Sequence, residues 1–390
     1  MAQAASTDFK TGDRLLMVGT MKGVFLFRGR GSGWSRLGDP QFPGHPAYAL
    51  AYDDRSGKPR LFAGSENPHF GAVLRQSDDL GRTWTNPAEP NLKFPADTGL
   101  ALKQIWQIAP GRADEPGVLY CGVEPSSLFE SRDGGVTWSL VRGLHENPQR
   151  AKWTPGGGGL CLHTVLPHPR DKARMLVASS TGGAYRTEDG GASWKASNTG
   201  VRAEFLPDKY PEFGQCVHKV VHHPSRPDRY FLQNHWGLYK SDDGAASWKD
   251  VASGVPSDFG FAMAIHPHDP DTVYIVPLQS DEFRCTPEAK LRVYRTRDAG
   301  KSWKPLTKGL PQKDAWETVL RDGLSTDRGE PAGIYFGTRS GKLFASRNDG
   351  DSWTCLASGL PPITCVRAAV VRDGAARAKG AKAAKKPRKR

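Results

Sequence analysis

A short segment ending in tryptophan recurs six times along the chain and constrains its fold more than any other feature. Each copy, which we call a box, follows the pattern Ser/Thr-x-Asp-x-Gly-x-Ser/Thr-Trp, with one replacement in each of two copies. A regular period of about 50 residues is typical of an array of equivalent supersecondary units. The boxes end 50 to 56 residues apart, at Trp84, Trp138, Trp194, Trp248, Trp303 and Trp353.

The residue types in a box suit a tight turn between two strands. An Asp side chain accepts hydrogen bonds from nearby backbone N–H groups, and Gly adopts backbone conformations that other residues resist. The tryptophan offers a large apolar face for burial between neighbouring units. Ala245 and Asn348 replace the usual Gly and Asp, and both are tolerated in turns. A degraded copy at residues 31–34 keeps Gly and ends at Trp34, 50 residues before Trp84, which makes seven units.

Three apolar segments precede a box, and each has the length of a strand. Before Trp194 they cover residues 159–168, 175–179 and 184–187, and a fourth strand follows the tryptophan. The first unit lacks its first strand, which residues 363–371 can supply from the other end of the chain. A ring closed in this way leaves no open sheet edge between its first and last units. We therefore predict an all-β protein, a single seven-bladed β-propeller of four-stranded blades over residues 14–371, closed by a C-terminal strand that completes the first blade.

Positive charge is concentrated at the C-terminal end of the chain. The formal net charge is +13, and residues 372–390 contain nine basic residues and one acidic residue, a net charge of +8. This tail contains too few apolar residues to form a core, so we expect it to be disordered. The alternative is a weak, salt-sensitive contact with nucleic acid or another polyanion.

The cysteines and the apolar segments predict a cytoplasmic protein without membrane contact. Six cysteines without a CxxC pair fit reduced thiols better than a disulfide framework. The N-terminal residues contain no apolar run of the kind found in signal peptides. No segment reaches the roughly 18 apolar residues that a membrane-spanning helix needs.

The boxes identify the chain as similar to the Asp-box, or BNR-repeat, β-propellers over residues 14–371. That superfamily includes sialidases, xyloglucan-processing glycosidases and sortilin-type receptors. Residues 155–163 and 210–218 resemble, more narrowly, bacterial proteins described as sialidase-like or BNR-repeat glycosyl hydrolases. The resemblance implies that ligands bind on the face of the ring opposite the boxes.

The sialidase motifs themselves are not matched by this sequence. Sialidases carry a Phe/Tyr-Arg-Ile-Pro motif near the first blade, whereas Phe27 and Arg28 are followed in this chain by Gly29 and Arg30. A tyrosine nucleophile held by an acid cannot be assigned to matching positions. Both departures argue against sialidase activity.

Candidate ligand-binding residues lie in segments assigned to the face opposite the boxes. Four tryptophans lie outside the boxes, and aromatic rings beside polar groups suit sugar rings or other flat ligands. An alternative role for these tryptophans is to pack loops onto the ring. Two Cys-x-His segments also occupy the same place in consecutive inner strands. The predicted binding residues are Trp106, Trp153, His163, Tyr210, His218, His235, Trp236, Arg284 and Trp316.

Carboxylates on the same face are candidates for catalysis. Glycoside hydrolysis uses two carboxyl groups about 5–10 Å apart, one of which is kept protonated by its surroundings. We choose Glu212, Asp281 and Glu282 as catalytic candidates. The wider set from which they come is Glu66, Glu124, Glu146, Asp208, Glu212, Asp281, Glu282 and Glu317.

Two functional hypotheses follow from the sequence. The first is a binding propeller whose face opposite the boxes holds a carbohydrate, a small anionic ligand or a protein partner. The second is a glycoside hydrolase acting on an oligosaccharide. We predict no cofactor and no metal, and the alternative is a divalent metal bound by His163, His218 and His235.

Overall fold

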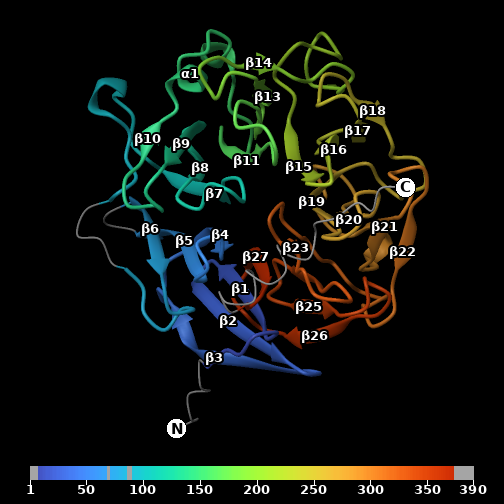
Figure 1. The fold of residues 1–390 in the computed structure, drawn as a ribbon. Helices are drawn as coiled ribbons and strands as arrows, with labels where there is room; N and C mark the ends of the chain where they lie inside the picture. The colour runs from blue at the N-terminus through green and yellow to red at the C-terminus, as the bar shows by residue number, and fades with distance from the viewer. Residues whose placement is uncertain (1–7, 68–70, 86–89, 373–390) are drawn as a thin grey trace, which may run out of the picture.

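The computed structural model describes residues 8–67, 71–85 and 90–372. They form seven antiparallel sheets arranged as the blades of a ring (Figure 1). The protein is a seven-bladed β-propeller, which confirms the fold predicted from the period of the boxes. From residue 373 onward, the predicted basic tail lies outside the described residues. No helix in the described part of the chain is long and apolar enough to cross a membrane.

The blades follow one another in chain order. Within each blade the strands are named below in their order from the centre of the ring to its rim. The first three blades are β27 (Ile363–Val370), β1 (Arg14–Thr20), β2 (Gly23–Arg30) and β3 (Gly33–Gln41); β4 (Ala47–Asp53), β5 (Arg60–Asn67) and β6 (Gly71–Ser77); and β7 (Gln104–Pro110), β8 (Leu119–Glu124), β9 (Ser127–Ser131) and β10 (Ser139–Leu140). The second blade has three strands within the described residues.

The other four blades each have four strands. They are β11 (Leu162–Pro167), β12 (Met175–Ser179), β13 (Gly183–Thr187) and β14 (Lys195–Ala196); β15 (Val217–His223), β16 (Arg226–Asn234), β17 (Leu238–Ser241) and β18 (Lys249–Asp250); β19 (Gly260–Ile265), β20 (Val273–Pro277), β21 (Val293–Thr296) and β22 (Lys304–Leu306); and β23 (Leu324–Thr326), β24 (Ile334–Gly337), β25 (Leu343–Ser346) and β26 (Thr354–Ala357). The helical segments are short: α1 (Arg142–His145) and 3-10 turns at Ala96–Thr98, Arg150–Lys152 and Pro287–Ala289.

The ring is closed where the two ends of the propeller meet. Strand β27 pairs antiparallel with β1, from Ile363 opposite Thr20 to Val370 opposite Arg14. The inner strands β27, β4, β7, β11, β15, β19 and β23 contact one another in sequence around the centre (Figure 1). A buried ion pair reinforces the joint, because Arg14 Nε in the first blade donates to Asp327 Oδ2 beside the last blade at 2.8 Å. The closing strand predicted from the sequence is therefore confirmed.

Each box forms the turn that follows the third strand of its blade. In the third blade, the Asp133 carboxylate accepts a hydrogen bond from the Thr137 backbone N–H at 2.9 Å, and Ser131 Oγ accepts one from Gly135 N–H at 2.9 Å. Gly135 has a φ of 93°, a left-handed conformation that favours glycine. Ala245, the one non-glycine residue at the equivalent position of the six boxes, adopts a φ of 65°. The box is thus a local turn device, as predicted.

Two of the box tryptophans connect neighbouring blades through hydrogen bonds. Trp248 is buried, and its indole N–H donates to the Ser197 carbonyl at 2.8 Å. Trp303 donates in the same way to the Val251 carbonyl at 2.8 Å. Since both acceptors precede the tryptophan by about one repeat, these contacts bind a blade to its predecessor. The tryptophans that define the period are therefore part of the scaffold.

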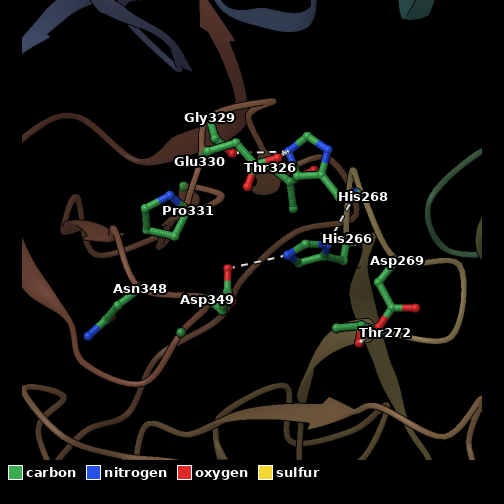
Figure 2. Close-up of polar contacts among 12 residues, drawn as sticks. His266, His268, Asp269, Thr272, Thr326, Gly329, Glu330, Pro331, Asn348 and Asp349 are labelled. Atoms are coloured by element: carbon green, nitrogen blue, oxygen red, sulfur yellow. Dashed lines mark hydrogen bonds and ion pairs between the residues drawn. The ribbon is translucent and has the colours of Figure 1, made fainter. Parts of the chain in front are cut away.

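Histidine side chains hold the turns between first and second strands on the face that carries the boxes. His266 Nδ1 accepts a hydrogen bond from His268 N–H at 3.2 Å, and His266 Nε2 lies 3.2 Å from Asp349 Oδ1 in the last box. Figure 2 shows this contact and the one from His268 Nε2 to the Gly329 carbonyl oxygen, which is 3.0 Å long. These histidines connect the sixth blade to the seventh and serve the scaffold.

Protonation of the box aspartates should weaken the ring at low pH. The hydrogen bond from the Thr137 hydroxyl lowers the pKa of Asp133 to about 2. The hydrogen bond from the Ser193 hydroxyl likewise holds the pKa of Asp189 well below its ordinary value. The pKa of an unfolded Asp is about 3.9, so both carboxylates stabilise the fold fully above about pH 5. Their contribution is lost as the pH falls toward 2. The free energy of unfolding, measured with urea at pH 7, 4 and 3, should decrease accordingly.

Asp133→Asn offers a matched test of this pH dependence. Asn348 already forms the same turn in the last box, where its Oδ1 accepts from Ser352 N–H at 3.0 Å. The variant keeps the turn but removes the titrating group, so it should lose less stability than the wild type between pH 7 and pH 3. An equal or larger loss in the variant would contradict the assignment.

Candidate functional site

A pocket of about 500 Å³ opens at the centre of the ring. Inner strands contribute Tyr48, Trp106 and Phe261, and the turn between β16 and β17 contributes His235 and Trp236. Successive turns of an antiparallel blade lie at opposite ends of its strands. The pocket therefore lies on the face opposite the boxes, which is the face selected from the sequence.

Six predicted residues line this pocket. They belong to the third, fifth and sixth blades and are Trp106, His218, His235, Trp236, Asp281 and Arg284. Other lining residues were not singled out from the sequence, among them Tyr48, Phe205, Phe261, Arg321 and Asp322. Of the three predicted catalytic carboxylates, only Asp281 reaches the pocket.

Two predicted binding residues lie in the core instead. Trp153 is buried, and its indole N–H donates to the Tyr185 hydroxyl at 3.0 Å. His163 is fully buried, and its Nε2 lies 2.9 Å from the Val217 carbonyl oxygen on the next inner strand. Burial lowers the pKa of His163 well below its ordinary value, which keeps the ring neutral. Both side chains join parts of the scaffold.

Four further predicted residues lie at the surface outside the pocket lining. Tyr210 is 61% exposed and Trp316 is 56% exposed. Glu212 and Glu282 are exposed as well. The Trp316 ring packs edge-on against the Phe283 ring, with 5.8 Å between centroids. All four lie in loops between strands, where the periodic pattern of the boxes does not predict the position of a side chain.

Two arginines give the pocket its positive charge. The Arg321 guanidinium lies 5.1 Å from the centroid of the Trp106 ring, and that of Arg284 lies 5.4 Å from the centroid of Phe261. Arg321 donates to the Cys161 sulfur at 3.4 Å, and Arg284 Nε donates to the Asp281 carbonyl oxygen at 2.9 Å. Within the described residues, neither guanidinium forms an ion pair with a carboxylate. These groups stacked on aromatic rings can therefore bind an anion.

One carboxylate of the pocket lining, that of Asp322, forms a nearly buried ion pair. Lys219 Nζ is 2.6 Å from Asp322 Oδ1, and both side chains are nearly buried. Burial lowers the pKa of Lys219, while the Asp322 carboxylate opposes this shift. Lys219 balances the negative charge of Asp322. The Asp322 carboxylate therefore does not cancel the positive charge that the arginines offer to an anionic ligand.

A cluster of one cysteine and two histidines lies at one side of the pocket. The ligand atoms of Cys216, His218 and His235 all lie within 4.8 Å of one another. Burial raises the pKa of the Cys216 thiol and lowers the pKa of His218 well below its ordinary value. The alternative set of His163, His218 and His235 is not the one brought together: His163 is buried in the core, and Cys216 lies beside the other two histidines.

Two carboxylates lie beside the aromatic wall of the pocket. Burial raises the pKa of Glu66, and the neighbouring Glu124 raises it further. Trp106 Nε1 donates to Glu124 Oε2 at 3.2 Å, which connects this pair to the pocket. Both residues were in the wider set of candidates, but spacing in the sequence gave no reason to choose them.

Fold and pocket together define a β-propeller with a ligand-sized hollow at the centre of one face. The family profile described as Sortilin-Vps10 (sortilin, neurotensin receptor 3) matches residues 185–316. The xyloglucanase Xgh74A of Acetivibrio thermocellus is 26% identical over 206 residues, which cover 46% of this chain and 23% of that protein. The chain spans 23% to 30% of the length of this and other curated xyloglucanases that it matches.

Solved structures support the fold. A GH74 enzyme of Niastella koreensis superposes with a TM-score of 0.54 at 14% identity, covering 88% of this chain and 47% of that one. YCF48 from Cyanidioschyzon merolae superposes with a TM-score of 0.51 at 13% identity, covering 80% and 86%. At 13% and 14% identity, both likenesses concern the fold alone.

Proposed function

We propose that the central pocket binds a small anionic ligand with a ring-shaped body, with sugar acids as the chemical class. The observation that carries this proposal is the pair Arg321 and Arg284. Each guanidinium lies near an aromatic ring, and neither forms an ion pair with a carboxylate among the described residues. An anion that reaches the pocket would receive charge-assisted hydrogen bonds from both.

The remaining pocket surface suits the body of such a ligand. Trp106 and Tyr48 form one aromatic pair with ring centroids 5.4 Å apart, and Phe205 and Trp236 form another at 5.1 Å. Aromatic faces bind the apolar faces of sugar rings. A volume of about 500 Å³ is within the usual range for small-molecule sites.

Replacing either arginine should weaken binding of a sugar acid. Arg321→Gln and Arg284→Gln each remove charge-assisted hydrogen bonds, so the dissociation constant for glucuronate should rise about 10- to 100-fold. Isothermal titration calorimetry measures the constant, and thermal shifts of the wild type with glucuronate, N-acetylneuraminate and glucose give the preference for the acid.

Arg132→Gln is the matched control for these variants. Arg132 lies in a box, is largely exposed and pairs with Glu130 on the opposite face of the ring. It should leave the dissociation constant unchanged. A wild type that binds glucose as well as glucuronate, or arginine variants that bind both acids normally, would overturn the proposal.

A second candidate function is hydrolysis of a glycosidic bond. It is supported by the Glu66 and Glu124 pair, because hydrolases of this class use two carboxyl groups of which one has a raised pKa. The similarity to xyloglucanases points to xyloglucan oligosaccharides as test substrates. Release of reducing sugar by the wild type, and its loss in Glu124→Gln, would favour this function over simple binding.

A further inference from the structure

We propose that Cys216, His218 and His235 form a binding site for a transition-metal dication of the zinc type. Asp281 acts as the positioning residue for His235. The proposal is independent of the sugar-acid proposal, although both concern the same pocket. It rests on the spacing of the three ligand atoms, on the hydrogen bonds that orient the two imidazoles, and on a comparison with the preceding blade.

The spacing of the ligand atoms fits tetrahedral coordination. Cys216 Sγ lies 3.6 Å from His218 Nε2, and one ligand atom of His235 lies within 4.8 Å of both. A zinc ion with Zn–S near 2.3 Å and Zn–N near 2.0–2.1 Å separates a sulfur and a nitrogen by about 3.6 Å at the tetrahedral angle. The cysteine and the first histidine therefore already have the separation that a bound ion requires.

Hydrogen bonds leave one nitrogen of each imidazole available. His218 Nδ1 donates to the Gly260 carbonyl oxygen at 2.6 Å, so its Nε2 carries the lone pair that faces Cys216. His235 Nε2 lies 3.0 Å from Asp281 Oδ2, which leaves Nδ1 to bind a metal. Metal-binding histidines generally donate their other ring nitrogen to a carbonyl or a carboxylate in this way.

Packing holds the His235 ring in place. The ring lies against Trp236 and Phe259, with centroids 4.3 Å and 5.1 Å away, and 5.3 Å from the His218 ring. A rigid ring suits a metal ligand, since little freedom is lost when the ion binds. The Cys216 thiolate and the Asp281 carboxylate would together bring two negative charges to a dication.

The preceding blade shows what the same motif looks like without a metal site. Cys161 and His163 occupy the equivalent positions, but His163 Nε2 is taken by the Val217 carbonyl oxygen, and both residues are fully buried. In the fifth blade His218 uses its other nitrogen on the neighbouring strand, and its Nε2 is turned toward Cys216. In the fifth blade the Cys216 sulfur and His218 Nε2 therefore face each other, as two ligands of one metal ion would, whereas His163 Nε2 in the fourth blade does not face Cys161.

The site has room for an exogenous ligand. Cys216, His218 and His235 all line the pocket, so a fourth coordination position would face its interior. Three protein ligands with one open position are typical of catalytic rather than structural zinc sites. A carboxylate held by the arginines could occupy that position.

Cobalt titration of metal-free protein tests the proposal. After treatment with a chelator, the wild type should bind one equivalent of Co²⁺, with visible bands typical of tetrahedral cobalt and a near-ultraviolet band from thiolate-to-metal charge transfer. Cys216→Ser should lose the charge-transfer band, and Asp281→Asn should bind Co²⁺ or Zn²⁺ about 10- to 100-fold more weakly. Cys355→Ser, which changes an exposed cysteine, should behave like the wild type.

Several outcomes would overturn the metal site. They are a wild type without a charge-transfer band, and Cys216→Ser or His235→Gln variants that bind the metal normally. Circular dichroism establishes that each variant is folded, and His235→Gln provides a second test if Cys216→Ser is not. Glucuronate binding is measured with the chelator present, so loss of metal binding and loss of anion binding are distinguished.

Discussion

Asp327→Ala should lower the free energy of unfolding by about 3–5 kcal/mol, because it leaves a buried arginine without its partner. The Asp327 side chain is 0% exposed, and it accepts hydrogen bonds from Arg14 Nε at 2.8 Å and from the Tyr335 hydroxyl at 2.7 Å. Two backbone N–H groups, of Gly329 and Gly333, also donate to it. Urea denaturation monitored by tryptophan fluorescence measures the change.

Asp114→Ala is the control for this substitution. Asp114 pairs with Arg112 at the surface, and its side chain is largely exposed. Exposed ion pairs contribute little, so the variant should lose much less stability than Asp327→Ala. If Asp327→Ala were no more destabilising than Asp114→Ala, the buried pair would not hold the first and last blades together.

A chain that ends at residue 362 should fail to form a cooperatively folded ring. The truncation removes β27, which pairs with β1 along its whole length. Strand β1 would become an open edge, and its buried residues Leu16 and Val18 would lose the core that β27 provides. Near-ultraviolet circular dichroism and size-exclusion chromatography should show lost tertiary structure and aggregation.

A chain that ends at residue 372 is the matched control for the truncation. It retains β27 and lacks only residues outside the described structure. It should unfold cooperatively, with the midpoint of the full-length protein. A cooperative transition at the same temperature in the shorter chain would show that closure by β27 is dispensable.

The scaffold could be predicted because the residues that form its turns recur at a regular period and interact with near neighbours in the sequence. Box residues such as Asp133 and Gly135 act within a few positions of one another, so their pattern alone reveals the turn. The missing first strand could be found in residues 363–371 because every unit needs four strands, and the first unit has no strand before residue 14. Neither step required knowledge of a loop path.

The site could be predicted only in part because loops decide which side chains reach the centre. Trp106 and Trp153 share a residue type and a predicted face, yet one lines the pocket and the other donates to Tyr185 in the core. Arg321 had no repeated motif to distinguish it, although it is one of the two pocket arginines that form no ion pair with a carboxylate among the described residues. His163 and His218 have the same sequence context, yet His218 lines the pocket and His163 lies in the core with its Nε2 on the Val217 carbonyl oxygen.

Because the last strand closes the ring, the pocket can form only late in the synthesis and folding of the chain. Tyr48 lies near the start of the propeller and Thr364 in its last strand, and both line the pocket. A ribosome must therefore synthesise nearly the entire propeller before the cavity has all of its walls. Ligand affinity should accordingly report completed folding, and a nascent or proteolytically shortened chain would be unable to compete with intact molecules for the ligand.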